Sequence, residues 1–293
     1  MRTMPLLLLA AALSLSGCDR VKSWFADQPD IRYAPAGENY AEKPDFAQIE
    51  YDYPIAATEL AKITPHYLAT LTQEQIDQLY ARLPAGPIPD GPFDGSIILP
   101  KGGSGKLRVA EILGGLKGLA AQFKGQKLEI VGETLWKGKV FYRDQKLLRN
   151  RIEDLTILRP ILGKGELAKI DVDGKDAWLL FPAKLYCGQS LLDSRRESII
   201  IDYAFTDEIA GYREIPDFLA GRNGLRVRDE IRMVRPGLYL GRAYLDRAFG
   251  LNFVLENQAI AAAENEEFLA GNSTVASVNE CWQGAQPRVV TRP

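Results

Sequence analysis

Residues 224–245 read GLRVRDEIRMVRPGLYLGRAYL, and this stretch is the most informative part of the chain. Up to the Pro-Gly pair, apolar and charged residues alternate, which is the period of a β-strand with one buried face. Pro236 and Gly237 suit the central positions of a type II turn, and a second strand-like run follows them. The stretch therefore predicts an antiparallel hairpin that buries one face in the protein core.

The buried face of the first strand of this hairpin carries one charged residue, Asp229. With Pro236-Gly237 at the turn, the expected pairing places Arg242 and Tyr244 across the hairpin beside it. An unpaired buried charge is very unfavourable, so we expect these three side chains to meet in a hydrogen-bonded cluster. Two interpretations remain open: a structural salt bridge, or a polar group that orients one end of a bound ligand.

Short strand-like runs separated by turn residues occupy most of the chain. No helices alternate with them, which argues for an antiparallel, curved or barrel-like sheet and against βαβ units. Two N-terminal helices are expected, over 72–83 and 106–124, and Thr72 and Gln75 have the spacing of a capping box. We therefore expect an α+β fold in a single globular domain over 58–293. The predicted strands are 96–99, 136–142, 147–152, 165–172, 177–183, 198–205, 225–234, 237–245 and 251–256.

Residues 135–141 read LWKGKVF, a strand pattern with Trp136 near its start. This pattern resembles the Trp-and-Gly first strands of calycin-type barrels. The resemblance implies a barrel interior that holds an apolar ligand, with Trp136 among the residues that bind it. The alternative is a strand that closes a core with an aromatic anchor. Alternation places Trp136 and Gly138 on one face of the strand, and Lys137 and Lys139 on the other.

Residues 1–17 have the pattern of an export signal peptide, because Arg2 precedes an apolar stretch that is too short to span a bilayer. The stretch ends in Leu15-Ser16-Gly17-Cys18, which resembles the lipobox of bacterial lipoproteins. The resemblance implies cleavage before Cys18 and attachment of several acyl chains to that residue, which would anchor the protein firmly. Asp19 resembles a signal for retention in the inner membrane. We expect a lipoprotein that faces the periplasm, in the inner rather than the outer membrane, with residues 18–57 as an extended tether.

Two cysteines remain once Cys18 is assigned to the lipid, Cys187 and Cys281. In an oxidising compartment they are expected to form a disulfide, and the alternative is two buried thiols. The disulfide would close a loop of about 95 residues and contribute about 4–5 kcal/mol in the chain-entropy model. Neither cysteine has a neighbouring histidine to activate it, so we do not expect a thiol nucleophile.

The composition excludes several classes of function. A chain of 293 residues with a net charge of −2 lacks the basic field that nucleic-acid binding needs. His66 is the one histidine and no calcium-loop pattern occurs, so we expect neither a metal nor a cofactor. Residues 100–107, PKGGSGKL, match neither a phosphate-binding loop nor a nucleophile elbow.

These observations lead to a hypothesis of a non-enzymatic, lipid-anchored envelope protein. Its barrel-like domain would bind an apolar or amphipathic small molecule, or a protein partner, with Trp136, Asp229, Arg242 and Tyr244 as candidate binding residues. One alternative is an envelope hydrolase or isomerase that uses the Asp229, Arg242 and Tyr244 cluster for acid–base chemistry. Another alternative is a structural subunit of an envelope assembly.

Overall fold

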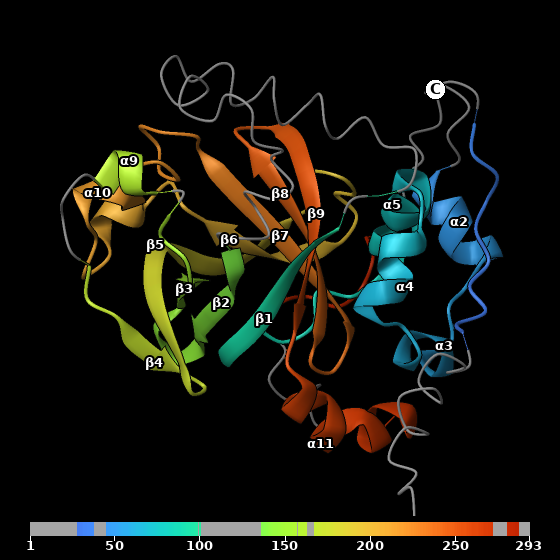
Figure 1. Cartoon of the computed structure of the whole chain (residues 1–293). Coiled ribbons are helices and arrows are strands. Elements are labelled where there is room, and N and C mark those ends of the chain that lie inside the picture. Colours follow the sequence, from blue (N-terminus) through green and yellow to red (C-terminus); the bar gives the residue numbers. More distant parts are fainter. Residues whose placement is uncertain are drawn as a thin grey trace, which may run out of the picture.

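The computed structural model describes residues 28–37, 45–98, 100, 136–156, 158–162, 167–271 and 280–286. Its centre is an antiparallel β-barrel (Figure 1). The strands follow the order β3-β2-β1-β9-β8-β7-β6-β5, and β3 also pairs with β5, which closes these eight strands into a ring. The remaining strand, β4, extends from β5. The strands are β1 Gly91–Ile98, β2 Trp136–Tyr142, β3 Leu147–Ile152, β4 Ile170–Val172, β5 Lys175–Gln189, β6 Glu197–Asp202, β7 Val227–Arg235, β8 Leu238–Leu245 and β9 Ala248–Glu256.

The helices lie outside the barrel (Figure 1). The predicted α+β class with a barrel-like antiparallel sheet is therefore confirmed. Helix α5 starts with the predicted capping box, in which Thr72 and Gln75 exchange side chain-to-backbone hydrogen bonds. The helix predicted over 106–124 lies outside the described residues. The helices are α2 Phe46–Asp52, α3 Ala57–Ala61, α4 Pro65–Thr70, α5 Gln73–Arg82, α9 Arg159–Leu162, α10 Glu214–Asp217 and α11 Gln258–Leu269, with short 3-10 turns at Arg143–Gln145 and Thr206–Glu208.

Helices α2 to α5 cover one side of the barrel wall (Figure 1). They pack there because the outward residues of β7, β8 and β9 include apolar side chains, which face apolar residues of α4 and α5. Ala34, in the stretch expected to be a tether, exchanges two hydrogen bonds with Gln78 of α5. No helix in the described ranges is long and apolar enough to cross a membrane. The buried residues of this layer are Ile63, Leu68, Leu71, Ile76, Leu79, Tyr80, Leu83, Ile98, Val234, Leu238, Leu240 and Val254.

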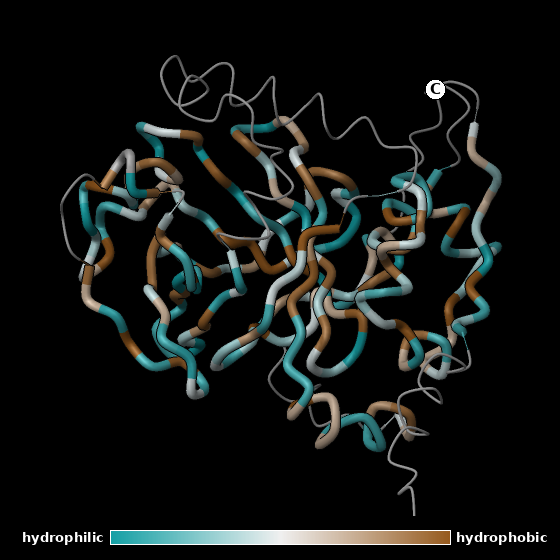
Figure 2. The backbone as a smooth tube through the Cα atoms, in the orientation of Figure 1, coloured by the Kyte–Doolittle hydropathy of each residue, from teal (hydrophilic) through white to brown (hydrophobic). Residues whose placement is uncertain are grey.

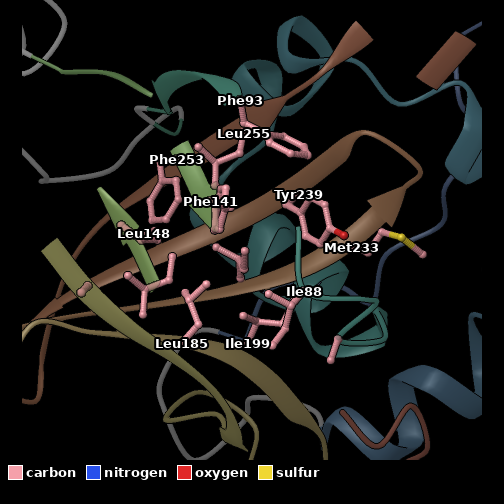
Figure 3. Close-up of a cluster of buried hydrophobic side chains, with 14 of the residues drawn as sticks. Ile88, Phe93, Phe141, Leu148, Leu185, Ile199, Met233, Tyr239, Phe253 and Leu255 are labelled. Atoms are coloured by element: carbon pink, nitrogen blue, oxygen red, sulfur yellow. The ribbon is translucent and has the colours of Figure 1, made fainter. Parts of the chain in front are cut away.

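The main hydrophobic core fills the inside of the barrel. Hydrophobic and hydrophilic stretches alternate along the strands (Figure 2), as expected when one face of each strand points inward. Figure 3 shows the aromatic rings of this core turned toward one another, and Phe93 packs edge-on against Phe141 and Tyr239. The core includes Ile88, Phe93, Phe141, Leu148, Leu185, Ile199, Ile201, Ile231, Met233, Tyr239, Phe253 and Leu255.

One end of the barrel is closed by residues 84–90 and by the C-terminal segment 280–286. The hydroxyl of Tyr239 donates to the Pro87 carbonyl at 2.7 Å, and the Gly86 amide donates to Oε1 of Gln283 at 2.8 Å. Cys281 forms a disulfide with Cys187 of β5, with 5.2 Å between the two Cα atoms. The predicted disulfide is confirmed, and it attaches the segment that closes this end to the barrel wall.

The hairpin of β7 and β8 forms where it was predicted, but the predicted pairing is wrong by one residue. Pairing shifts between Met233 and Arg235, so Asp229 lies opposite Ala243. The cause is a β-bulge: the Met233 amide donates to the carbonyls of Pro84 and Ala85 in the closing loop. Beyond the bulge every side chain of β8 faces the opposite side from the one expected.

Strand β2 also presents its faces differently from the simple alternation that the sequence suggests. Pairing shifts between Trp136 and Gly138, and Gly138 has a φ of 139° that other residues rarely adopt. After this irregularity Lys139 points into the barrel together with Phe141. Simple alternation predicts Lys139 on the face opposite Trp136, and that prediction is wrong.

Candidate functional site

Lys139 is the centre of a polar network inside the barrel, where its side chain is only 3% exposed. Its ammonium group donates to Oδ2 of Asp229 at 2.9 Å, to the hydroxyl of Tyr203 at 2.7 Å and to Oδ1 of Asn150 at 2.9 Å. A lysine ammonium has three protons to donate, so all of its capacity is used. The charges of Lys139 and Asp229 neutralise each other in the barrel interior.

Asn150 of β3 joins this network to the residues around it. Its Oδ1 accepts from Nε1 of Trp136 at 2.9 Å as well as from Lys139, while its Nδ2 donates to the Tyr203 hydroxyl and to the Phe181 carbonyl. Both protons and both lone pairs of the amide are therefore engaged. This one side chain fixes the ring of Trp136, the backbone of Phe181 and the head of Lys139.

The barrel interior keeps Lys139 charged. Burial by itself would lower the pKa of the amine, but the charge of Asp229 and the hydrogen bonds to Tyr203 and Asp229 outweigh it and raise the pKa. Burial raises the pKa of Tyr203 to about 12, although the charge of Lys139 opposes it. The lysine is thus a protonated hydrogen-bond donor, and it is poorly suited to act as a base or nucleophile.

Aromatic rings surround the ammonium group of Lys139. Its Nζ lies 5.4 Å from the ring centroid of Trp136, 5.4 Å from that of Tyr203 and 5.5 Å from that of Phe253, within the range of cation–π attraction. Gly95 leaves room for the Trp136 ring, because a Cβ atom there would lie 2.4 Å from its Cη2. The indole is therefore held both by close packing and by its hydrogen bond to Asn150.

A set of partly exposed apolar residues flanks the network at the end of the barrel opposite the disulfide. We call this set the apolar rim, and it consists of Trp136, Phe181, Val227, Ala243 and Leu251. These residues pack against the barrel core but keep part of their surface open. At the disulfide end Cys187 and Ile260 are also only partly buried, and residues 84–90 and 280–286 cover the core there. The arrangement is a partly open apolar surface next to a buried set of hydrogen-bonding groups.

The predicted cluster of Asp229, Arg242 and Tyr244 does not form. Because of the bulge in β7, Arg242 and Tyr244 point out of the barrel while Asp229 points into it. Arg242 instead forms a buried ion pair with Asp77 of α5 and donates to the Tyr244 hydroxyl at 3.0 Å. The acid–base enzyme hypothesis that required these three groups together therefore loses its geometric basis.

The other candidate residues are placed as follows. Trp136 and Asp229 belong to one network, linked through Asn150 and Lys139, so two of the four predicted binding residues come together. His66 is exposed on α4. Within the described ranges, one group of side chains could hold a metal ion, and it consists of Cys187, Glu197 and Cys281. The two sulfur atoms of this group are already joined in the disulfide.

Sequence reasoning missed Lys139, Asn150 and Tyr203. A signal for Lys139 was present, because it alternates with Phe141 and a strand that buries Phe141 on one face must bury Lys139 as well. Asn150 sits in the run LLRNRI, where nothing distinguishes an inward amide from an exposed one. Tyr203 continues the alternation of Ile199 and Ile201, so its position in the sequence is that of one more core residue.

Comparison with known proteins gives no family for this chain. No protein-family model matches it, and neither does any curated protein. One similar solved structure is described as a protein from Thermomonospora curvata, with 16% sequence identity over 64% of this chain and 88% of that chain. The TM-score is 0.33, and so low a similarity supports no conclusion about fold or function.

Proposed function

We propose that this chain is a lipid-anchored protein of the bacterial envelope, and that its barrel binds a small amphipathic molecule without transforming it. The observation that carries the proposal is the buried Lys139 network beside the apolar rim. Ligand sites are mostly apolar with a few fixed polar groups that orient the ligand, and this end of the barrel has that composition.

The charges of the network indicate the chemical class of the ligand. Lys139 and Asp229 already neutralise each other, so a ligand with a net charge would have to break a buried ion pair to gain a new one. A molecule with an apolar body and a neutral, hydrogen-bonding head avoids that cost. Its body would contact the rim, and its head would replace one internal hydrogen bond of the network, such as the bond that the Trp136 indole donates to Asn150.

Binding without catalysis follows from the state of the same groups. The ammonium of Lys139 has all its protons engaged and a raised pKa, so it does not supply a free amine. Asp229 accepts hydrogen bonds from Lys139 and Tyr203, so its carboxylate is engaged within the network. An envelope assembly role would also fit the absence of catalysis, and the binding experiment below separates the two.

The binding experiment uses a neutral apolar probe, N-phenyl-1-naphthylamine, with the chain from residue 18 onward carrying Cys18→Ser so that no lipid is attached. We expect saturable fluorescence enhancement. Leu251→Asn in the rim should weaken binding at least about tenfold, because burying a leucine contributes about 1.5–3 kcal/mol. Leu269→Asn on α11, where the leucine is 43% exposed, should change nothing. Enhancement that never saturates, or equal effects of both variants, would overturn the binding proposal in favour of an assembly role.

The anchor is tested by growing cells with an alkyne-labelled fatty acid. The protein should incorporate the label, and Cys18→Ala should abolish incorporation because the cysteine sulfur is the atom that is acylated. A control variant, Cys187→Ala/Cys281→Ala, should still incorporate it. Label in the Cys18→Ala protein, or none in the unmodified one, would contradict the lipoprotein assignment.

A further inference from the structure

Phe181 has a strained backbone in the middle of β5. Its φ is 52°, a left-handed conformation that is uncommon for bulky residues. The strain coincides with a bulge: Leu148 pairs with Ala183 but Asn150 pairs with Leu180, so Phe181 belongs to an extra stretch of β5. Such conformations persist where surrounding contacts hold them, and they cluster at functional sites.

Two buried side chains hold the Phe181 peptide groups from opposite sides. The Phe181 amide donates to Oδ1 of Asp217 at 2.7 Å, and its carbonyl accepts from Nδ2 of Asn150 at 3.1 Å. Asp217 is fully buried, and its other oxygen accepts from the Arg213 amide at 2.9 Å. Asp217 therefore uses both of its oxygens to hold backbone amides, one in β5 and one just before α10. It makes no hydrogen bond to Lys139 itself, and in the described part of the chain the two are linked through Phe181 and Asn150.

The Phe181 side chain lies at a junction between two hydrophobic clusters. It packs against the barrel core and also against the cluster beside α9. Among the described residues, Trp136 is the other side chain that packs against both clusters. Both side chains are held by Asn150, Trp136 through its indole nitrogen and Phe181 through its carbonyl. Trp136 and Phe181 are therefore the described side chains that connect the cluster beside α9 to the barrel core and the Lys139 network. The cluster beside α9 includes Ile152, Leu155, Leu158 and Leu180.

We propose that Phe181 is the gate to the binding site of the barrel and that Asp217 is the positioning residue that keeps the gate closed. The inference rests on the proposed binding function. Asp217 stabilises the strained peptide, and this peptide sets the ring between the two clusters. Loss of the Asp217 contact releases the peptide toward ordinary strand geometry and moves the ring away from its position beside Trp136.

The first test concerns the strain and needs no ligand. In an ordinary strand, glycine is less stable than alanine, but at a φ of 52° the order reverses because glycine tolerates this conformation. We expect Phe181→Gly to unfold at a higher urea concentration than Phe181→Ala, although both lack the ring. A lower midpoint for Phe181→Gly would show that residue 181 is not held in the strained conformation, and would overturn the positioning role of Asp217.

The second test measures the association rate of N-phenyl-1-naphthylamine by stopped-flow fluorescence. Phe181→Ala should bind the probe about tenfold faster than the unmodified protein because the ring is gone. Asp217→Ala should also bind it about tenfold faster, because release of strain of this kind corresponds to about a factor of ten in a conformational equilibrium. Asp207→Ala is the matched control, since Asp207 lies in the same loop region but pairs with Arg222 at the surface. Its rate should be unchanged.

The outcomes separate the gate from the binding function. Binding by the unmodified protein with equal rates in all variants would overturn the gate and leave the binding function standing. Binding that occurs only in Phe181→Ala would support the gate. No binding in any variant would overturn the binding function and the gate together, while the order of Phe181→Gly and Phe181→Ala would still report on the strain. If Asp217→Ala does not fold, Phe181→Ala carries the kinetic test.

Discussion

Replacing Lys139 with methionine should lower the free energy of unfolding by about 3–5 kcal/mol, the usual cost of removing one partner of a buried ion pair. The loss is large because Asp229 would keep its place in the barrel interior without the ammonium that neutralises it, and Asn150 and Tyr203 would each lose a donor. Urea unfolding followed by circular dichroism measures the change.

Two further variants show whether the buried charge is the cause. In Lys139→Met/Asp229→Leu both charges are gone, and most of the lost stability should return because apolar replacement of a buried pair is often neutral. Lys169→Met is the matched surface control: Lys169 pairs with Asp176 at 3.2 Å, but both side chains are at least half exposed, so the change should stay below about 1 kcal/mol. If the double variant instead loses stability equal to the sum of the two single losses, an unpaired buried charge is not the cause.

The pH dependence of the Lys139 contribution has a definite sign. The pKa of Lys139 is raised in the folded protein, so its contribution is fully present below the unfolded value of about 10.4 and is lost as pH rises through the folded value. The difference in stability between the unmodified protein and Lys139→Met should therefore narrow in strongly alkaline urea titrations.

Removal of the disulfide should have an effect of similar size. Cys187 and Cys281 are 94 residues apart in the sequence, and in the chain-entropy model closing so long a loop contributes about 4–5 kcal/mol. Cys187→Ala/Cys281→Ala should lose about that much stability in urea unfolding. The mutant should also lose protection from hydrogen exchange at the Gly86 amide, because the segment that carries Gln283 is no longer attached to the barrel.

The single variants provide the control for this prediction. Cys187→Ala alone already breaks the bond, so it should lose about as much as the double variant, and a reductant should bring the unmodified protein to the same midpoint. A loss below about 1 kcal/mol in all three cases would contradict the model in which the bond mainly constrains the unfolded chain.

Much of the barrel could be predicted from the sequence because its strands have one buried face. The runs 136–142 and 147–152 were predicted with the bounds that β2 and β3 have, and the Pro236-Gly237 turn was placed correctly. Helix α11 was missed although Asn257 is a good N-cap, whose side chain accepts from the Ala259 and Ile260 amides. Its apolar residues do not recur with a helical period, so the periodicity that identified α5 was lacking.

The site could be predicted only in part because its composition depends on bulges. A one-residue shift in pairing exchanges the two faces of a strand. The described strands contain four register shifts, and three of them affect the site, in β2, β5 and β7. They bring Lys139 into the barrel, give Phe181 its strained backbone and send Arg242 to the outer face. The bulge in β7 depends on hydrogen bonds from Met233 to a loop about 150 residues earlier in the chain, which no local pattern reveals.

We propose that the ligand binds at the apolar rim, at the end of the barrel away from the disulfide. Energy transfer to N-phenyl-1-naphthylamine tests it directly in two variants of the Cys18→Ser chain, each with a single tryptophan. One retains Trp136 in the rim, and the other retains Trp282, which is 47% exposed beside Cys281 at the closed end. We expect strong, saturable quenching of Trp136 emission by the probe and little quenching of Trp282. Equal quenching of both, or stronger quenching of Trp282, would contradict it.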